Sequence, residues 1–210
     1  MKIIGICGSP RTGGNSAAML ESALAGAVEQ GAEVERINLF SLQYSGCHSC
    51  FACKRLGGEN FGRCALRDDL TEVLDQVLSA DAVIIATPLY FGEVPGAVRN
   101  FFERLWFPGL LYSKRFAIAY KKRVKVGLIY TMNVADHAMY QGVIKGHQQN
   151  FMMLLGNTEV VVAEDTLQFD DYSKYASEMF DGAAKKLRHE TVFPEECAKA
   201  YEMGRRLAAK

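Results

Sequence analysis

The sequence predicts a single α/β domain built on a five-stranded parallel sheet with helices on both faces. Short apolar segments with the period of a strand alternate along the chain with segments of helical period, which is the pattern of such a sheet. The 210 residues are 49% hydrophobic and contain no glycine-serine or proline-rich linker. One domain, residues 1–210, therefore has enough apolar surface for a sizeable core.

The strands are expected where apolar residues form short runs. The first begins directly after Met1, and two later runs, Val83–Ala86 and Val124–Tyr130, are nearly continuous in apolar residues. Continuous runs are typical of interior strands that are buried on both faces. The expected strands are residues 2–7, 33–39, 81–87, 124–131 and 158–164.

The helices are expected between these strands and after the last one. Two carry recognisable start signals: Asp69–Glu72 has the outline of a capping box, and Pro194 suits a first helical turn. Residues 101–107 are too apolar for a free helix surface and predict a subunit interface in a homodimer or homotetramer. The expected helices are residues 15–30, 69–79, 95–106, 138–155, 172–188 and 194–208.

The charge balance excludes two classes of partner. The chain has 24 basic and 24 acidic residues, which gives no electrostatic reason to expect binding to nucleic acid or to a membrane surface. It has no apolar run near 20 residues and no signal peptide, so we expect a cytoplasmic protein without a membrane span.

The loop after the first strand has the composition of an anion site. Gly8–Ser16 joins that strand to a helix whose first amide groups have no internal partner, and such amides attract phosphate. Hydroxyls of Ser9, Thr12 and Ser16 add donors, and Arg11 adds a charge. We therefore expect a phosphorylated cofactor, with a monophosphate the best fit; the alternative is an ordinary glycine-rich turn.

Two better-known phosphate loops do not match. A P-loop requires Lys-Ser or Lys-Thr where this chain has Gly14-Asn15, so nothing here would neutralise a triphosphate. The dinucleotide fingerprint fails because the glycines of Gly5–Gly8 have the wrong spacing.

A second informative segment, Thr87–Gly92, follows the third strand. Apolar and aromatic residues where the chain leaves the sheet are explained by a flat ring that rests on them. The alternative is that Tyr90 and Phe91 fill the core or a subunit interface.

Together, Gly8–Arg11, Gly14–Ser16 and Thr87–Gly92 resemble the flavodoxin-like NADPH-dependent FMN reductase family, as far as residue 135. The resemblance implies a flavodoxin-like three-layer sandwich with strand order 2-1-3-4-5, a bound FMN and NAD(P)H as electron donor. It implies that the phosphate is held by Ser9, Arg11, Asn15 and Ser16, and that the isoalloxazine lies along Pro88, Leu89, Tyr90, Phe91 and Gly92 with the loop from Thr131 to Asn133 on its other side.

Four cysteines between the second strand and the second helix narrow the resemblance to the iron-sulfur flavoproteins. Cys47, Cys50 and Cys53 have C-x2-C-x2-C spacing, and Cys64 follows; four thiolates are what a [4Fe-4S] cluster requires. The ten residues 54–63 are a longer last gap than the iron-sulfur members have. The alternatives are a zinc site, free thiols, or a redox-sensitive pair of Cys47 and Cys50.

Two main functions follow from this interpretation. The first is an FMN-dependent NAD(P)H oxidoreductase that reduces flavin, a quinone or another small acceptor. The second is an iron-sulfur flavoprotein that exchanges electrons with a ferredoxin-like partner, and a flavodoxin-like binding module with an empty site is a third. Because a flavin carries the hydride itself, no acid-base residue is assigned.

Overall fold

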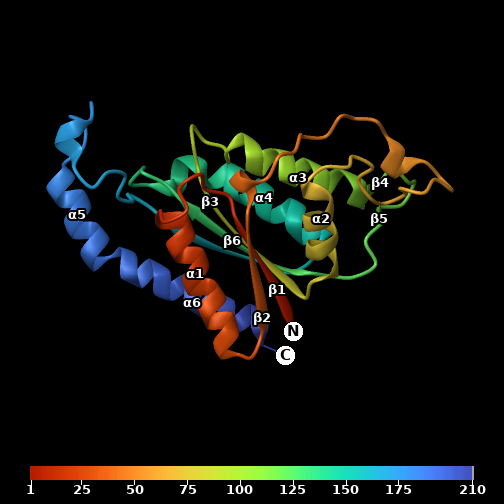
Figure 1. Ribbon diagram of the computed structural model, residues 1–210, viewed down its shortest axis with the longest axis horizontal. Helices are drawn as coiled ribbons and strands as arrows, with labels where there is room; N and C mark the ends of the chain where they lie inside the picture. The colour runs from red at the N-terminus through yellow and green to blue at the C-terminus, as the bar shows by residue number, and fades with distance from the viewer. Residues whose placement is uncertain (210) are drawn as a thin grey trace.

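A computed structural model describes residues 1–209 and contains the five-stranded parallel sheet that the sequence predicts (Figure 1). The strands lie in the order β2-β1-β3-β6-β7, which is the order 2-1-3-4-5 when the sheet strands alone are counted. The flavodoxin-like fold class is therefore confirmed. The strand bounds are β1 Lys2–Cys7, β2 Glu33–Asn38, β3 Ala82–Pro88, β6 Lys125–Thr131 and β7 Thr158–Ala163.

The register aligns the carboxyl ends of the three central strands. Cys7 pairs with Ala86, and Pro88 pairs with Thr131. Strands β2 and β3 lie on opposite sides of β1, so the connections that follow β1 and β2 cross the sheet in opposite directions. Open α/β sheets bind ligands outside the carboxyl ends of the strands at such a switch point.

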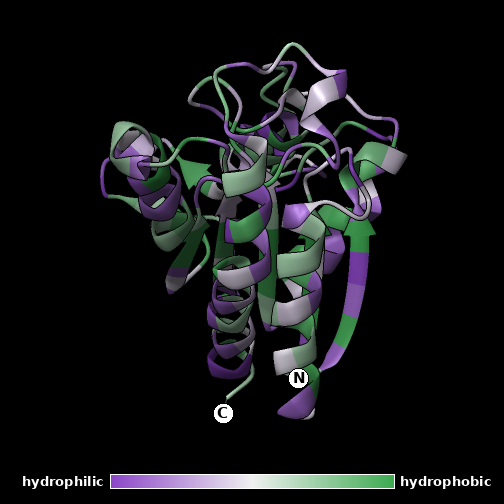
Figure 2. Ribbon diagram, turned by 90° about the vertical axis from the view of Figure 1, so that its left-hand side faces the viewer, coloured by the Kyte–Doolittle hydropathy of each residue, from purple (hydrophilic) through white to green (hydrophobic). Residues whose placement is uncertain are grey.

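Helices cover both faces of the sheet and divide the core in two. One cluster joins Ile4 and Ile6 to residues of α2, α3 and α4, and the other joins Ile3 and Cys7 to residues of α1 and α6. In Figure 2 the central strands are mainly green behind helices in which green and purple residues alternate, whereas the edge strand β2 is largely purple. The helix bounds are α1 Asn15–Glu29, α2 Leu70–Ser79, α3 Gly96–Gly109, α4 Gln141–Leu154, α5 Gly182–Thr191 and α6 Phe193–Ala208.

Smaller elements fill the connections. An antiparallel pair, β4 Leu110–Leu111 and β5 Ala117–Ile118, follows α3. Four 3-10 helices are η1 Leu39–Ser41, η2 Ala52–Lys54, η3 His137–Tyr140 and η4 Tyr172–Lys174. None of the helices within residues 1–209 is long and apolar enough to cross a membrane.

The prediction of one helix over residues 172–188 is wrong. Only the short turn η4 forms at its start, and α5 begins at Gly182, where the Asp181 side chain accepts hydrogen bonds from the amides of Ala183 at 2.9 Å and Ala184 at 3.0 Å. An aspartate is a strong N-cap because it satisfies these free amides. The cap therefore fixes the start of α5 ten residues later than expected.

The capping box at Asp69 is also wrong. The side chain of Asp69 makes no cap to α2 and instead accepts a hydrogen bond from the amide of Gln43. Asp68 accepts from the amide of Leu70 at 3.1 Å, while its own amide donates to Thr71 Oγ1 at 3.1 Å. The reciprocal arrangement exists one residue earlier than the pattern indicated.

The apolar run 101–107 does not require a subunit interface. Phe101, Phe102 and Leu105 are fully buried against the sheet and α4 within this one chain. The run is explained by the core, so the oligomeric state that we inferred from it loses this support.

Two glycines allow α1 and α6 to pack closely. A Cβ atom on Gly204 would lie 1.8 Å from the carbonyl oxygen of Ala23, and one on Gly26 would lie 2.1 Å from that of Tyr201. Real Cβ atoms do not approach backbone this closely, so the two helices meet only because these positions lack side chains.

Replacing Gly204 with alanine should therefore destabilise the protein by about 1–3 kcal/mol through overpacking. Gly146 of α4 has open space around it, so Gly146→Ala should stabilise by about 0.5–1 kcal/mol as a better helix former. Chemical denaturation of both variants measures the difference. Equal stability of the two variants would contradict the packing argument.

Candidate functional site

The loop between β1 and α1 carries the features of an anion site. Helix α1 begins after Gly14 with no side-chain cap and no acidic residue in its first turn, so its first amides point outward without internal partners. Ser9 and Ser16 are buried at 5% and 3% exposure. This local arrangement provides free donors for an anion.

Ser16 ties this loop to the end of β6. Its Oγ shares a buried hydrogen bond of 2.7 Å with Oγ1 of Thr131. The structure therefore brings together one residue predicted for the phosphate and one predicted for the far side of the ring, although 115 positions separate them in the chain.

Arg11 and Asn15 contact a segment that the sequence did not assign to the site. Arg11 Nη1 donates to the carbonyl of Gln168 at 2.7 Å, and Asn15 Nδ2 donates to that of Leu167 at 2.8 Å. The segment after β7 thus lies beside the phosphate loop. No sequence signal identified it, because a backbone carbonyl is available at every residue.

The segment after β3 forms a tight aromatic turn, residues 90–93. The amide of Tyr90 donates to the carbonyl of Glu93 at 2.8 Å, and the reverse bond measures 3.1 Å. Phe91 and Gly92 have φ of 51° and 83°, as in the turns that favour glycine. A phenylalanine in this region is strained, and such strain is concentrated at functional sites.

The two rings of this turn are presented to the outside. Phe91 has a relative exposure of 107% and Tyr90 of 47%, whereas Leu89 before them is buried. The alternative in which Tyr90 and Phe91 fill the core of this chain is therefore wrong. The turn offers apolar surface beside the end of β6, to which the Leu89 amide is tied by a 3.0 Å bond to the carbonyl of Thr131.

A buried histidine supports the aromatic turn from α4. His147 Nδ1 lies 3.0 Å from the hydroxyl of Tyr130, and its Nε2 lies 3.1 Å from Oε1 of Glu93. Since burial lowers the pKa of His147, the neutral form is favoured. With Nε2–H donating to the carboxylate, Nδ1 accepts from Tyr130.

His147 was not among the predicted site residues. Its position three residues after Ile144 and four before Phe151 places it on the buried face of α4. That spacing was the sequence feature that could have identified His147 as a structural residue, because a polar side chain on an apolar helix face needs a hydrogen-bond partner.

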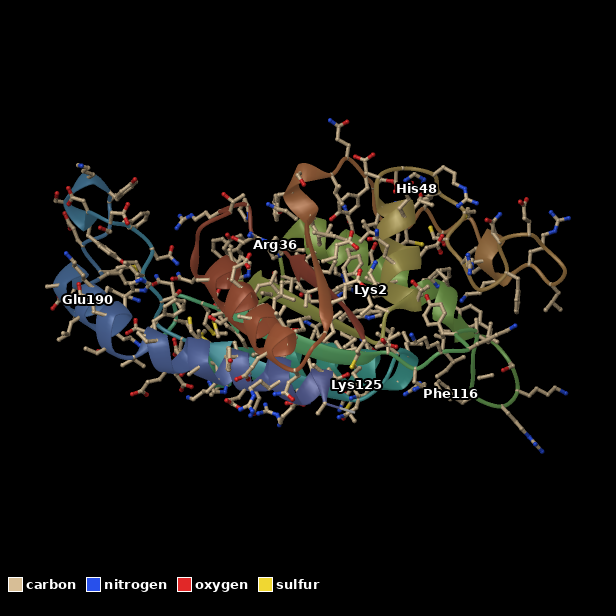
Figure 3. The ribbon with its side chains drawn as sticks, turned by 60° about the horizontal axis from the view of Figure 1, so that its bottom comes forward. Lys2, Arg36, His48, Phe116, Lys125 and Glu190 are labelled. Atoms are coloured by element: carbon tan, nitrogen blue, oxygen red, sulfur yellow. The ribbon has the colours of Figure 1, made fainter. Side chains whose placement is uncertain are left out.

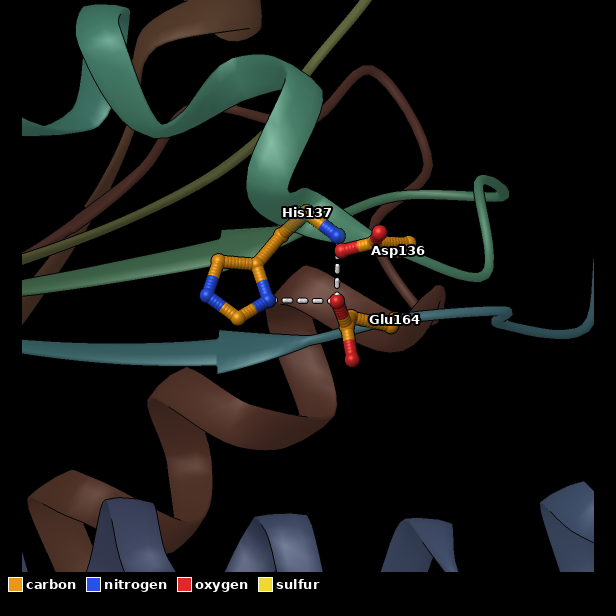
Figure 4. Close-up of side chains that lie close together, drawn as sticks. All are labelled: Asp136, His137 and Glu164. Atoms are coloured by element: carbon orange, nitrogen blue, oxygen red, sulfur yellow. Dashed lines mark hydrogen bonds and ion pairs between the residues drawn. The ribbon is translucent and has the colours of Figure 1, made fainter.

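A further polar group lies at the ends of β6 and β7 (Figure 4). Asp136, His137 and Glu164 offer ligand atoms within 4.8 Å of one another, the only such group in the part of the chain that the structure describes. Asp136 caps η3 through the amide of Ala138, and both the amide and Nδ1 of His137 contact Glu164. These contacts fasten the loop after β6 to the end of β7.

The four predicted metal ligands line one pocket at the C-terminal end of α3. The loop between β2 and α2, on which Figure 3 labels His48, brings Cys47, Cys50, Cys53 and Cys64 to a common cavity against Phe107 and Arg104. In Figure 1 the loop, coloured orange, passes over α2 and α3. The longer gap before Cys64 therefore does not keep that thiol away from the other three.

The four thiols share one pocket but do not already converge on a single point. Within residues 1–209, no three of the four Sγ atoms lie within 4.8 Å of one another. A tetrahedral zinc ion with Zn–S bonds of about 2.3 Å would need sulfurs about 3.8 Å apart. A [4Fe-4S] cluster is likewise held by four cysteine thiolates, so the four residues supply the ligand type that either group requires.

The pocket is also partly closed to water. Burial raises the pKa of the Cys53 thiol and outweighs the opposing effect of the nearby Lys54 cation, because burial disfavours a charged thiolate. All six cysteines in the described chain are free thiols. Lys54 fastens the cysteine loop to the end of α3, because its ammonium donates to the carbonyls of Phe107, Pro108 and Leu110.

The fold and these sites define a flavodoxin-like α/β protein in which the uncapped start of α1 and an exposed aromatic turn both adjoin the end of β6. The chain matches the NADPH-dependent FMN reductase family over residues 1–165, and it belongs to that family. The match extends 30 residues beyond the part in which the motifs alone showed the resemblance.

Two curated relatives carry the name iron-sulfur flavoprotein. That of Methanosarcina thermophila is 28% identical over 188 residues, which are 86% of this chain and 94% of that protein. That of Methanocaldococcus jannaschii is 35% identical over 127 residues, which are 60% of this chain and 59% of that protein. The chain thus spans somewhat more than half the length of the latter relative.

Solved structures show the same fold at lower identity. An NAD(P)H:quinone oxidoreductase from Methanothermobacter marburgensis has a TM-score of 0.69 and 16% identity, covering 100% of this chain and 98% of that one. An FMN-dependent NADH-azoreductase from Bacillus anthracis in complex with FMN has a TM-score of 0.68 and 17% identity, covering 99% of both chains.

The depressed pKa of His147 predicts how stability depends on pH. Burial, the first cause, outweighs the opposing pull of Glu93, and Arg99 acts in the same direction as burial. The unfolded chain then binds a proton near pH 6.5, where the folded protein does not. The stability from neutral His147 is therefore complete above pH 6.5 and is lost as the pH falls towards the lower folded pKa.

The variant His147→Gln should flatten the fall of the unfolding free energy between pH 7 and pH 5, measured by denaturant titration at each pH. The exposed His48→Gln serves as the matched control. An unchanged slope in His147→Gln would contradict the assignment of this acid sensitivity to His147.

Proposed function

We propose that the protein is an FMN-dependent NAD(P)H oxidoreductase that reduces flavin, a quinone or another small acceptor in the cytoplasm, within one domain of residues 1–210. The observation that carries the proposal is the carboxyl edge of the sheet, where the uncapped start of α1 and the exposed aromatic turn both adjoin Thr131. A phosphate fits the first feature and a flat apolar ring the second.

The chain's own residues divide into two groups in this proposal. When bound, FMN supplies hydride transfer from the nicotinamide, and the protein binds and orients it. The phosphate group is assigned to Ser9, Arg11, Asn15 and Ser16, and the ring to Pro88, Leu89, Tyr90, Phe91, Gly92 and Thr131. Arg11 and Asn15 would have to exchange at least one of their present bonds to the segment after β7 to reach the phosphate directly.

A second function is favoured by the cysteine pocket. Four thiols on one cavity support a [4Fe-4S] cluster held by Cys47, Cys50, Cys53 and Cys64. The protein would then be an iron-sulfur flavoprotein that exchanges electrons with a ferredoxin-like partner. Relatives with that name are 28% and 35% identical to this chain.

The exposed ring of Phe91 also supports self-association. We propose a homodimer or homotetramer in which a second copy covers part of the apolar surface at the aromatic turn, where the Phe91 ring is fully exposed and the Tyr90 ring half-exposed in the single chain.

Removing the Ser16 hydroxyl should weaken FMN binding about tenfold or more, because a hydrogen bond to a charged group contributes about 1.5–3 kcal/mol. Arg11→Ala should act in the same direction. Ser22 lies on the same helix and its hydroxyl donates to the carbonyl of Ala18, so Ser22→Ala is the control. Fluorescence titration of FMN measures the affinities, and unchanged values for Ser16→Ala and Arg11→Ala would sink the phosphate assignment.

Cys64→Ser should lose most of the bound iron after anaerobic reconstitution and keep its FMN, because the two sites use different residues. Cys197→Ser on α6, outside the pocket, should keep both. Iron and flavin are quantified on the same samples. Full iron content in Cys64→Ser would remove Cys64 from the ligand set.

A further inference from the structure

Arg104 is a buried cation that the proposed reaction does not use. It lies on α3 between Phe101 and Leu105, and its side chain has 0% exposure. A charged side chain is almost never fully buried unless it is paired. Its position against the cysteine pocket therefore calls for a specific partner.

The hydrogen bonds of Arg104 all reach the segment that carries the cysteines. Nη1 donates to Asp68 Oδ2 at 2.5 Å and to the carbonyl of Ser45 at 3.3 Å, and Nη2 donates to the carbonyl of Leu66 at 3.2 Å. Nε donates to Cys64 Sγ at 3.3 Å. One guanidinium thus joins both ends of the cysteine loop to α3.

Cys64 differs from the other three pocket cysteines because its sulfur accepts a hydrogen bond from a charged group. In the described chain, two hydrogen bonds reach their sulfurs: the amide of Ser49 to Cys47 at 3.5 Å, and Nε of Arg104 to Cys64. Only the second comes from a charged group. Charge-assisted hydrogen bonds are stronger than neutral ones, and burial keeps this cation close to the sulfur with little screening by water.

We propose that Arg104 and Asp68 form an opposed pair of positioning residues that sets the reduction potential of a [4Fe-4S] cluster in this pocket. The inference rests on the second function proposed above. Reduction adds one electron, supplied by an external reductant, and makes the cluster more negative. A buried N–H donor to a ligand sulfur stabilises that state and raises the potential, while the nearby carboxylate opposes it.

The two members of the pair predict shifts of opposite sign. Arg104→Gln removes the cation and leaves Asp68 negative, so the reduced cluster becomes less stable and the potential falls. Asp68→Asn leaves Arg104 uncompensated, so the potential rises, and the amide oxygen of asparagine can still cap the amide of Leu70. Each shift should correspond to about a tenfold change in the one-electron equilibrium, or about 59 mV.

The test is an anaerobic redox titration of the reconstituted protein, followed by the paramagnetic signal of the reduced cluster, with iron and FMN measured on each sample. Arg63→Gln is the matched control, because Arg63 adjoins Cys64 in sequence and has a side chain that is 70% exposed. Its potential should stay at the wild-type value, since water and salt screen a charge at the surface.

Arg104→Lys keeps the charge if Arg104→Gln does not fold. It loses the planar fork that reaches Asp68 and Cys64 together, and a smaller fall in potential is expected. Asp68→Asn tests the opposite sign independently of either variant.

Each outcome is decisive. Shifts of opposite sign with an unmoved control support the proposal. If Arg104→Gln and Asp68→Asn hold their iron but keep the wild-type potential, or shift it in the same direction, the role of Arg104 is overturned. The cluster proposal then stays intact. A wild-type protein that binds FMN but no iron would overturn the cluster proposal, and the role of Arg104 with it.

Discussion

The close approach of β1 to β3 at Gly8 is the constraint on which the rest of the site depends. The Gly8 amide donates to the carbonyl of Ala86 at 2.8 Å, and a Cβ atom on Gly8 would lie 2.5 Å from Cγ2 of Val98. Only glycine fits between the last residues of β3 and the start of α3. Because β1 ends there, the anion-binding loop, the aromatic turn and the end of β6 all emerge at one edge of the sheet, at the switch point where such folds bind ligands.

Helix α3 connects this edge to the cysteine pocket. It begins directly after the aromatic turn, and its later residues form one wall of the pocket. A row of polar contacts follows the helix: Glu93 to Arg99 at 3.7 Å, Arg99 to Glu103 at 3.5 Å, and the amide of Cys47 to Glu103 at 3.4 Å. These exposed ion pairs contribute little to stability, but they hold the turn and the cysteine loop to the same rigid element. The geometry of each proposed redox site therefore depends on α3.

The sequence predicted the sheet, its order and the loops at its edge, because these follow from apolar periodicity and from glycine and cysteine spacing. It misplaced the start of α5 because Asp181 caps a helix that the apolar period alone extended back to residue 172. It also missed Arg104 and His147, whose roles come from partners far away in the chain. Both residues are polar and lie on the buried face of an apolar helix, and that position indicates that each needs a hydrogen-bond partner. The partners themselves could be identified only from the three-dimensional structure. The contact of Arg11 with Gln168 had no signal at all.

The central claim is that the chain holds FMN at the carboxyl edge of its sheet, and the second proposed function adds an iron-sulfur cluster in the cysteine pocket at the C-terminal end of α3. It is tested most directly by the flavin and iron content of protein purified without oxygen. The first proposed function predicts one FMN per chain, and the second predicts about four irons as well, the stoichiometry of a [4Fe-4S] cluster. FMN without iron would confine the protein to the first proposed function with free thiols in its pocket, and protein that binds neither group after reconstitution would contradict the account.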